Sequence, residues 1–332
     1  MSYRITTDST CDMPREFYTE HSIPCVGLGF QINGKEYREG SEDCMPIHDF
    51  YEALRGGAQS TTMQVNTYDF IDFVEPYLQA GEDVLHLCFS SGLSGTYESV
   101  ERGAAELREK YPDRTILVVD SLAASMGEGL LLYYAQMHKE AGMTIQENAK
   151  WLEDNKLHLC HWFTVDDLMH LHRGGRVSKA SAIFGSLLGI KPVLHVDDEG
   201  HLILMSKSRG RQGAMEALAA KMKETVNDDV SDQMILISHG DCLEDAEKLK
   251  AIVQQVTGAR HFMLHTIGTV IGSHSGPEHW PSFSWESIDK WLHDKAKRRA
   301  CPLRFFLSIR KALPLKPLFQ RKLHHGVSLD AV

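Results

Sequence analysis

An imidazole flanked by hydroxyl groups lies near the end of the body of the chain. His274 stands between Ser273 and Ser275, with Gly272 before them and Gly276 after them. Glycines on both sides predict a tight turn, because glycine accepts the backbone conformations that turns require. Hydroxyl and imidazole groups are hydrogen-bonding partners for an oxygen anion. We therefore expect this segment to bind a carboxylate or a phosphate.

Two further hydroxyl clusters lie far away in the sequence. Residues 60–62 read Ser-Thr-Thr, and residues 90–96 contain three serines and one threonine. Both clusters are predicted to begin helices, whose first N–H groups lack partners within the helix and attract anions. Together with residues 273–275, they predict one site for an acidic head group.

The first half of the chain alternates predicted strands and helices. Apolar runs predict strands at residues 3–7, 83–89 and 115–119, and the turn dipeptide Asn33-Gly34 predicts a hairpin at 25–37. Helical spacing predicts one helix from residue 97 and another through 130–137. This order predicts a parallel sheet with helices on both faces, and ligands bind such sheets at the carboxyl ends of the strands. Polar residues follow three of these strands: Asp8, Ser9, Thr10, residues 90–96, Asp120 and Ser121.

The second half predicts a mixed sheet. Strands are expected at residues 190–196 and 201–206 around the turn 197–200, then a helix at 212–226, a strand at 234–238, a helix at 243–256 and a strand at 262–267. We therefore predict an α/β protein with two domains and the ligand in the cleft between them. The N-terminal domain, residues 1–156, carries a parallel sheet, and the C-terminal domain, residues 157–281, carries a mixed, partly antiparallel sheet. Residues 282–332 form an extension.

The charge of the extension differs from that of the body. Residues 282–332 contain 11 Lys and Arg against 4 Asp and Glu, a charge of +7, which leaves −17 for residues 1–281 out of the total of −10. The acidic total argues against general nucleic-acid binding. Basic residues mixed with Phe and Leu over residues 295–319 predict either a helix at a membrane surface or a helix packed on the acidic body.

Cysteine and histidine spacing predicts neither disulfides nor a metal site. The seven cysteines are odd in number, widely spaced and never form a Cys-x-x-Cys pair. The histidine pairs at positions 158 and 161, and at 170 and 172, lack a carboxylate at ligand spacing, so we expect no metal. There is no apolar stretch near the ~20 residues of a membrane span and no signal-peptide pattern, so we expect a cytoplasmic protein, in contact with membranes at most peripherally.

Several short motifs in fixed order resemble the DegV family of fatty-acid-binding proteins over about residues 1–280. The matching segments are Thr7-Asp8-Ser9-Thr10 with Asp12 and Pro14, Leu-Ser-Gly-Thr-Tyr at 93–97, Asp120-Ser121, Arg-Gly-Gly-Arg-Val-Ser at 173–178, Ile-Lys-Pro at 190–192, Arg209 with Arg211, and residues 271–277. The resemblance implies a carrier subunit without catalytic residues or a cofactor of its own. A long-chain fatty acid lies between its domains, and a separate ATP-binding kinase subunit, which holds ATP and Mg²⁺, converts the carboxylate to an acyl phosphate.

The resemblance also implies roles for individual residues. Thr62, Ser94 with Gly95, and His274 hold the carboxylate; nearby support comes from Asp8, Ser9, Ser273 and Ser275; contacts to the kinase or to phosphate come from Arg173, Arg176 and Arg209. One motif departs from the family, because Thr62-Met63-Gln64-Val65 stands where many relatives read Thr-Ser-Gln-Pro. Thr61 therefore stays open as the alternative to Thr62.

Two other functions compete with the carrier. Gly92-Leu-Ser94-Gly-Thr96 resembles the nucleophile elbow of a hydrolase apart from its last residue, and Ser94, His274 and Asp120 form a candidate triad for acyl esters. A phosphotransferase subunit acting on a polyol is the second alternative, and it predicts a polar ligand. Neither a P-loop nor a Gly-x-Gly-x-x-Gly motif after a strand is present, so ATP must come from a partner.

Overall fold

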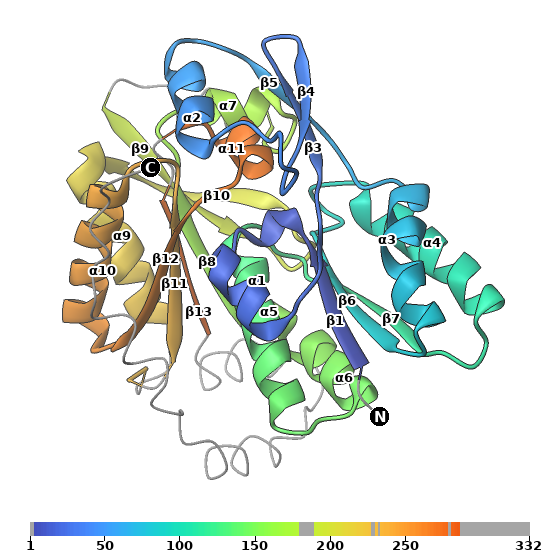
Figure 1. Ribbon diagram of the computed structural model, residues 1–332. Helices are drawn as coiled ribbons and strands as arrows, with labels where there is room; N and C mark the ends of the chain where they lie inside the picture. The colour runs from blue at the N-terminus through green and yellow to red at the C-terminus, as the bar shows by residue number, and fades with distance from the viewer. Residues whose placement is uncertain (1–2, 179–188, 227–229, 232, 278–279, 286–332) are drawn as a thin grey trace, which may run out of the picture. The chain divides into compact units, whose positions relative to one another are not determined.

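A computed structural model of the protein describes residues 3–178, 189–226, 230–231, 233–277 and 280–285. These residues all belong to one compact unit of the chain and form three β-sheets (Figure 1). The extension from residue 286 onward, with the helix predicted at residues 295–319 either at a membrane surface or on the body, lies outside the described residues.

The first sheet has the predicted parallel topology. Its strands are arranged in the order β2 (Cys25–Val26), β1 (Tyr3–Asp8), β6 (Asp83–Cys88) and β7 (Ile116–Asp120), and every neighbouring pair is parallel. One face carries α3 (Thr67–Gln79) and α4 (Thr96–Lys110), and the other carries α5 (Met126–Glu140) and α6 (Ile145–Asn155). The helices therefore cover both faces, as the alternating pattern of the sequence predicts.

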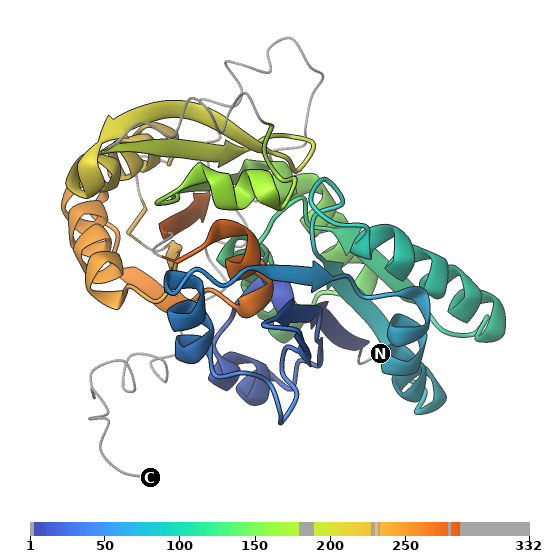
Figure 2. The same ribbon diagram turned by 90° about the horizontal axis from the view of Figure 1, so that it is seen from above.

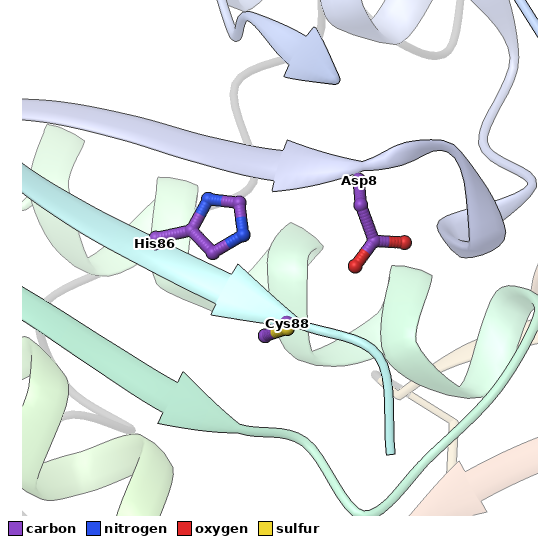
Figure 3. A group of neighbouring side chains, drawn as sticks. All are labelled: Asp8, His86 and Cys88. Atoms are coloured by element: carbon purple, nitrogen blue, oxygen red, sulfur yellow. The ribbon is translucent and has the colours of Figure 1, made fainter. Parts of the chain in front are cut away.

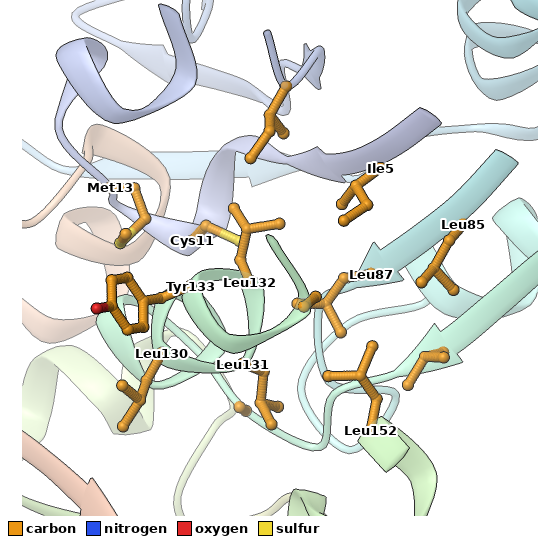
Figure 4. Close-up of a cluster of buried hydrophobic side chains, with 14 of the residues drawn as sticks. Ile5, Cys11, Met13, Leu85, Leu87, Leu130, Leu131, Leu132, Tyr133 and Leu152 are labelled. Atoms are coloured by element: carbon orange, nitrogen blue, oxygen red, sulfur yellow. The ribbon is translucent and has the colours of Figure 1, made fainter. Parts of the chain in front are cut away.

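Helix α5 joins the cores of two sheets. Leu130, Leu131 and Leu132 are all fully buried, because α5 packs against the first sheet on one side and against the second sheet on the other. Figure 4 shows this cluster around Leu85 and Leu87 of β6. Eleven of the 15 residues of α5 are buried, which is typical of a helix in the interior of a protein. It fixes the two sheets relative to each other.

The second sheet is mixed, as predicted. Its order is β10 (Leu202–Arg209), β9 (Ile190–Val196), β8 (Leu159–Thr164), β13 (Trp280–Trp285), β11 (Met234–His239) and β12 (His261–Thr266). Among the described strand pairs of this sheet, only β11 and β12 are parallel. Helices α9 (Gly210–Thr225) and α10 (Leu243–Thr257) pack against this sheet. The domain boundaries at residues 156 and 281 stay predictions; β13 continues past the second of them.

The third sheet contains one confirmed prediction and one error. The hairpin of β3 (Gly29–Ile32) and β4 (Lys35–Arg38) turns at Asn33 and Gly34, which have positive φ angles of 52° and 77°. It is shorter than the predicted range 25–37, because residues 25–26 form β2 of the first sheet. The third strand of the third sheet is β5 (Ser60–Met63), where a helix start was predicted. The nearest helix, α3, begins only after Asn66, whose side chain accepts the N–H of Asp69. Three consecutive hydroxyl residues suit an extended strand equally well, and pairing with β3 decides between the two.

The segment around His274 is a helix and not the predicted turn. Helix α11 (Thr269–Ser275) follows β12 and ends at Gly276, whose φ is 75°. Its first residues carry no local capping side chain, so the sequence gives no helix signal. Strand β13, which was not predicted, follows this segment.

The remaining elements are short connections. They are the 3₁₀ turns η1 (Ser9–Cys11) and η2 (Lys156–His158), and the helices α1 (Arg15–His21), α2 (Ile47–Arg55) and α7 (Leu168–Arg173). Figure 2 shows α11 between β5 and α7, which both contact it. Among the described helices, none has the length and apolar character needed to cross a bilayer.

Candidate functional site

A cavity of about 160 Å³ lies between the first and second sheets. Loops at the carboxyl ends of β6 and β7 form one wall, β8, β9 and β10 form another, and β5 and α11 close it. Most of the lining is apolar: Leu28, Phe89, Leu93, Ala124, Phe163, Leu171, Val196, Leu202, Val270 and Ile271. The polar lining residues are Thr62, Gln64, Ser94, Gly95, Ser125, His161, Arg176, His274 and Ser275.

Thr62 and His274 form one polar unit in this cavity. The Thr62 hydroxyl lies 2.8 Å from His274 Nε2, although the two residues are 212 positions apart. Strand alternation places Thr62 inward, while Thr61 and Met63 are exposed. Thr62, and not Thr61, therefore lines the cavity.

The His274 ring is held on both of its sides. Nδ1 is buried and has no hydrogen-bond partner among the described residues. A Cβ atom added at Gly174 would lie 2.1 Å from this Nδ1, so the backbone of residue 174 packs directly against the ring. Burial, with the nearby charge of Arg176 as a second cause, lowers the pKa of His274 to about 4. The imidazole is therefore neutral at physiological pH.

Two buried carboxyl groups from the N-terminal part of the chain hold the start of α11. Glu39 Oε1 accepts hydrogen bonds from the Val270 N–H at 2.9 Å and the Thr269 hydroxyl at 2.8 Å. Asp12 Oδ1 accepts the N–H of Gly268 at 2.7 Å. These side chains replace the missing local cap and suit the positive end of the helix. Sequence reasoning missed Glu39, because a cap from 230 positions away leaves no local pattern.

Ser94 combines a structural contact with a place in the cavity. Its Oγ accepts the N–H of Thr96 at 3.2 Å and lies 2.9 Å from the Thr96 hydroxyl. It thereby supports the first turn of α4, whose own N-cap, Gly95, offers no side chain. Both Ser94 and Gly95 line the cavity. That this helix start binds an anion stays a prediction.

Arg176 brings a positive charge into the cavity wall. Its Nε donates to the carbonyl of Leu93 at 3.0 Å, and its Nη1 donates to the carbonyl of Gly174. In the described residues no carboxylate pairs with it, and burial lowers its pKa. A guanidinium stays protonated in proteins, so this half-buried cation lacks a counter-charge within the described chain. An anionic ligand would supply one.

The other predicted site residues lie outside the lining, with one exception. Ser275 lines the cavity, but Ser273 points to β5, where its Oγ lies 2.7 Å from Ser60 Oγ. Asp8 is buried and accepts the N–H of Phe89, and Ser9 accepts the N–H of Leu28, so each supports a lining residue from behind. Arg173 and Arg209 are exposed and do not line the cavity.

The candidate hydrolase triad is not assembled. His274 Nε2 faces Thr62 and its Nδ1 meets no carboxylate in the described residues, whereas a triad histidine bonds a serine and an acid. Asp120 instead accepts the N–H groups of Ser91 and Leu122 at 3.1 Å, which orders its own loop. The geometry favours a binding site.

Comparison with known sequences identifies the family. Residues 2–285 match the family described as "Uncharacterised protein, DegV family". The chain belongs to the DegV family. The DegV domain-containing protein CPE0026 of Clostridium perfringens is 42% identical over 272 residues, which cover 82% of this chain and 93% of that protein.

Solved structures of the family share this fold. A DegV lipid-binding protein from Thermotoga maritima has a TM-score of 0.76 and 29% identity, covering 86% of this chain and 99% of its own. A DegV family protein from Thermus thermophilus, described for its fatty acid binding, has a TM-score of 0.76 and 27% identity, covering 86% and 100%. Fatty acid binding is therefore a property of DegV relatives of this chain, and the resemblance read from the motifs is confirmed.

Proposed function

We propose that this chain binds a long-chain fatty acid in the cavity and presents the carboxylate to an ATP-binding kinase subunit, which forms the acyl phosphate. The observation that carries the proposal is a largely apolar cavity with Thr62, Ser94, His274 and Arg176 in its wall. An amphiphile with one anionic end matches this lining.

Apolar burial supplies most of the affinity. A C16 acyl chain contains about 15 methylene and methyl groups, and burying them contributes on the order of 12 kcal/mol before the costs of ordering. The cavity volume of about 160 Å³ is close to that of a dry protein cavity that takes benzene. A long chain therefore needs the apolar walls to move apart, and we expect a larger cavity in the ligand-bound protein.

The head group needs partners, because a buried carboxylate without hydrogen bonds would cancel this gain. The hydroxyls of Thr62 and Ser94 provide them, and the neutral His274 ring holds the Thr62 hydroxyl in place through Nε2. Arg176 provides a single opposite charge. The motifs that supply the hydroxyls and imidazole contain no arginine, so the sequence predicts only neutral donors there; the fold brings Arg176 to them. One cation, already donating to two carbonyls, balances the charge and leaves a carboxylate oxygen available to attack ATP.

Exposed basic residues suit a partner that carries phosphate. Arg173 ends α7 and Arg209 ends β10, and both side chains are exposed. Since neither lines the cavity, their replacement should leave fatty-acid affinity intact. We assign them to the contact with the kinase subunit or with its nucleotide.

Reconstitution tests this assignment. The purified chain is loaded with palmitate and mixed with Mg-ATP and the ATP-binding kinase subunit of its own organism, and the acyl phosphate is trapped with hydroxylamine. We expect acyl hydroxamate only when both proteins are present, and less of it with Arg173→Ala or Arg209→Ala at unchanged palmitate affinity. Turnover of a p-nitrophenyl ester by the chain alone, abolished in Ser94→Ala, would instead establish the hydrolase.

The extension has its own test. We propose that residues 295–319 bring the carrier to anionic membranes, where its ligand resides. Sedimentation with phosphatidylglycerol liposomes compares the full chain with a chain that ends at residue 285. Equal binding of the two would remove the membrane role.

A further inference from the structure

Three side chains with metal-ligating atoms meet at the carboxyl ends of β1 and β6. They are Asp8, His86 and Cys88, all fully buried, and one ligand atom from each lies within 4.8 Å of the others. Figure 3 shows how the two neighbouring strands bring them together. The parallel register places Thr6 opposite His86, so Asp8 comes out on the same face of the sheet as His86 and Cys88.

His86 is oriented for ligation. The Thr6 hydroxyl lies 2.9 Å from Nδ1, which fixes the ring from behind. Nε2 is buried and finds no hydrogen-bond partner among the described residues. The edge of the ring that carries it faces Asp8 and Cys88 in Figure 3. Buried polar atoms without partners are uncommon in native proteins, so this nitrogen calls for an explanation.

We propose that Asp8, His86 and Cys88 form a buried site for one Zn²⁺ ion. A nitrogen, a thiolate and a carboxylate are the three ligand types that zinc accepts, and a water molecule can complete the tetrahedron. Zn²⁺ with one thiolate and one carboxylate has no net charge, which suits a fully buried position. This site differs in place and purpose from the cavity for the fatty acid.

Metal binding would change the ionisation of the cluster. Burial lowers the pKa of His86 to about 3, so its ring is neutral and Nε2 can offer a lone pair. Burial, with Asp8 among the lesser causes, raises the pKa of Cys88 well above its usual value. Its thiol therefore holds a proton until zinc replaces it: Cys88 Sγ bonds the metal and one proton leaves to solvent.

Asp8 is held for the same role. Its Oδ2 accepts the N–H of Phe89 at 2.9 Å, and its Oδ1 accepts the N–H of Thr10 at 3.0 Å. The Thr10 hydroxyl lies 2.5 Å from Asp8 Oδ1 and 2.9 Å from Glu128 Oε2, and one hydroxyl hydrogen cannot serve two carboxylates. Burial raises the pKa of both carboxyl groups, and that of Glu128 well above its usual value. Asp8 accepts two backbone N–H groups, which favour its charged form, so we place the shared proton on Glu128 and the negative charge on Asp8.

A second group of side chains with metal-ligating atoms provides the contrast. His48, Glu52 and Asp241 also bring ligand atoms together, but two of the three are exposed. Arg55 Nη1 lies 2.6 Å from Asp241 Oδ2 and 2.8 Å from Glu52 Oε1, so a cation already neutralises these carboxylates. Only the buried cluster combines a thiol with an unpartnered nitrogen.

This site was not predicted from the sequence, and the reason is geometric. His86 and Cys88 are separated by one residue, which places them on one side of a strand, and Asp8 joins them only through strand pairing. The spacing rules for zinc motifs describe ligands on one hairpin or one helix. The expectation of no metal followed from those rules alone.

Cobalt substitution tests the site, because Co²⁺ bound to thiolate absorbs in the near ultraviolet and visible range. The full chain is unfolded in guanidinium and refolded with CoCl₂, so that burial does not block entry. We expect one Co²⁺ per chain after desalting, the thiolate absorption band, and displacement of cobalt by ZnCl₂. A refolded chain without the band, or with cobalt bound only as weakly as surface histidines bind it, would overturn the proposal. That result is expected if an ordered water molecule, and not a metal ion, is the partner of His86 Nε2.

Four variants sharpen the test. Cys88→Ser removes the thiolate band, and Thr6→Val, which deletes only the partner of Nδ1, weakens cobalt affinity about 10–100-fold. Cys160→Ser is the matched control, since Cys160 is also buried but lies on β8 in the second sheet. His48→Ala controls for the surface cluster. Neither control should change the band, and a band that persists in Cys88→Ser refutes the assignment even if other variants fail to fold.

Discussion

Replacing Gly174 with alanine tests whether the His274 ring must stay in place for ligand binding. The added Cβ would lie 2.1 Å from Nδ1, and ordinary contact begins at 3.4 Å, so the ring must retreat by about 1.3 Å. The hydrogen bond of Nε2 to Thr62, at 2.8 Å, blocks retreat away from residue 174. The ring therefore rotates out of its position and the hydrogen bond is lost.

The magnitude follows from the head group. His274 Nε2 holds the Thr62 hydroxyl in the cavity wall, and a hydrogen bond from that hydroxyl to the charged carboxylate contributes about 1.5–3 kcal/mol. Loss of this orientation therefore weakens binding roughly 10–150-fold. The backbone conformation of residue 174 is an ordinary right-handed one, so alanine adds no strain of its own. Palmitate affinity is measured by calorimetry on delipidated protein, and circular dichroism confirms the fold.

Two comparisons make the result specific. Gly213→Ala, whose Cβ meets only the Ser208 hydroxyl, is the matched control and should leave palmitate affinity unchanged. In a His274→Ala background, Gly174→Ala should have no further effect, because the ring it displaces is gone. Equal losses from Gly174→Ala with and without His274 would show that the reasoning about the ring is wrong.

Three further predictions concern the same site. Thr62→Val should weaken palmitate binding about tenfold, whereas Thr61→Val, on the exposed side of β5, should not; calorimetry compares the two, and equal effects would contradict the inward placement of Thr62. Glu39→Leu removes the cap of α11 and should lower the free energy of unfolding by about 1–2 kcal/mol and weaken palmitate binding. Glu39→Gln keeps a hydrogen-bond acceptor and should retain most of the stability and most of the palmitate affinity. Denaturant titration measures the difference, and a Leu variant as stable as the native chain would contradict the cap. The pKa of His274 is about 4 in the folded protein and near 6.5 in the unfolded chain, so the free energy of unfolding falls as the pH drops from 6.5 to 4. Relative to His274→Gln, the native chain should lose on the order of 3 kcal/mol over that range. Parallel pH profiles of the two proteins would refute the lowered pKa.

Much of the fold follows from local patterns in the sequence. Strands β1, β6 and β7 and helices α4 and α5 all lie where apolar runs and helical spacing predict them. The hairpin turn at Asn33-Gly34 also forms as predicted, because both residues tolerate positive φ. These elements are determined by residues close together in the chain.

The parts that the sequence does not predict depend on distant residues. Residues 60–62 are a strand because β3 lies beside them, and α11 is a helix because Glu39 and Asp12 hold its first N–H groups. Arg176 comes from a motif that reads equally well as a helix end, and only the fold shows it in the cavity wall. The choice between Thr61 and Thr62 also required the strand, because alternation gives the two side chains opposite directions.

Mass spectrometry of the lipid extracted from freshly purified protein tests the central claim most directly. The account predicts close to one long-chain fatty acid per chain, and a much smaller yield from a chain in which Leu93 and Phe163 of the cavity wall are both replaced by glutamate. A wild-type protein that carries no fatty acid, and takes up none when offered palmitate, would contradict it.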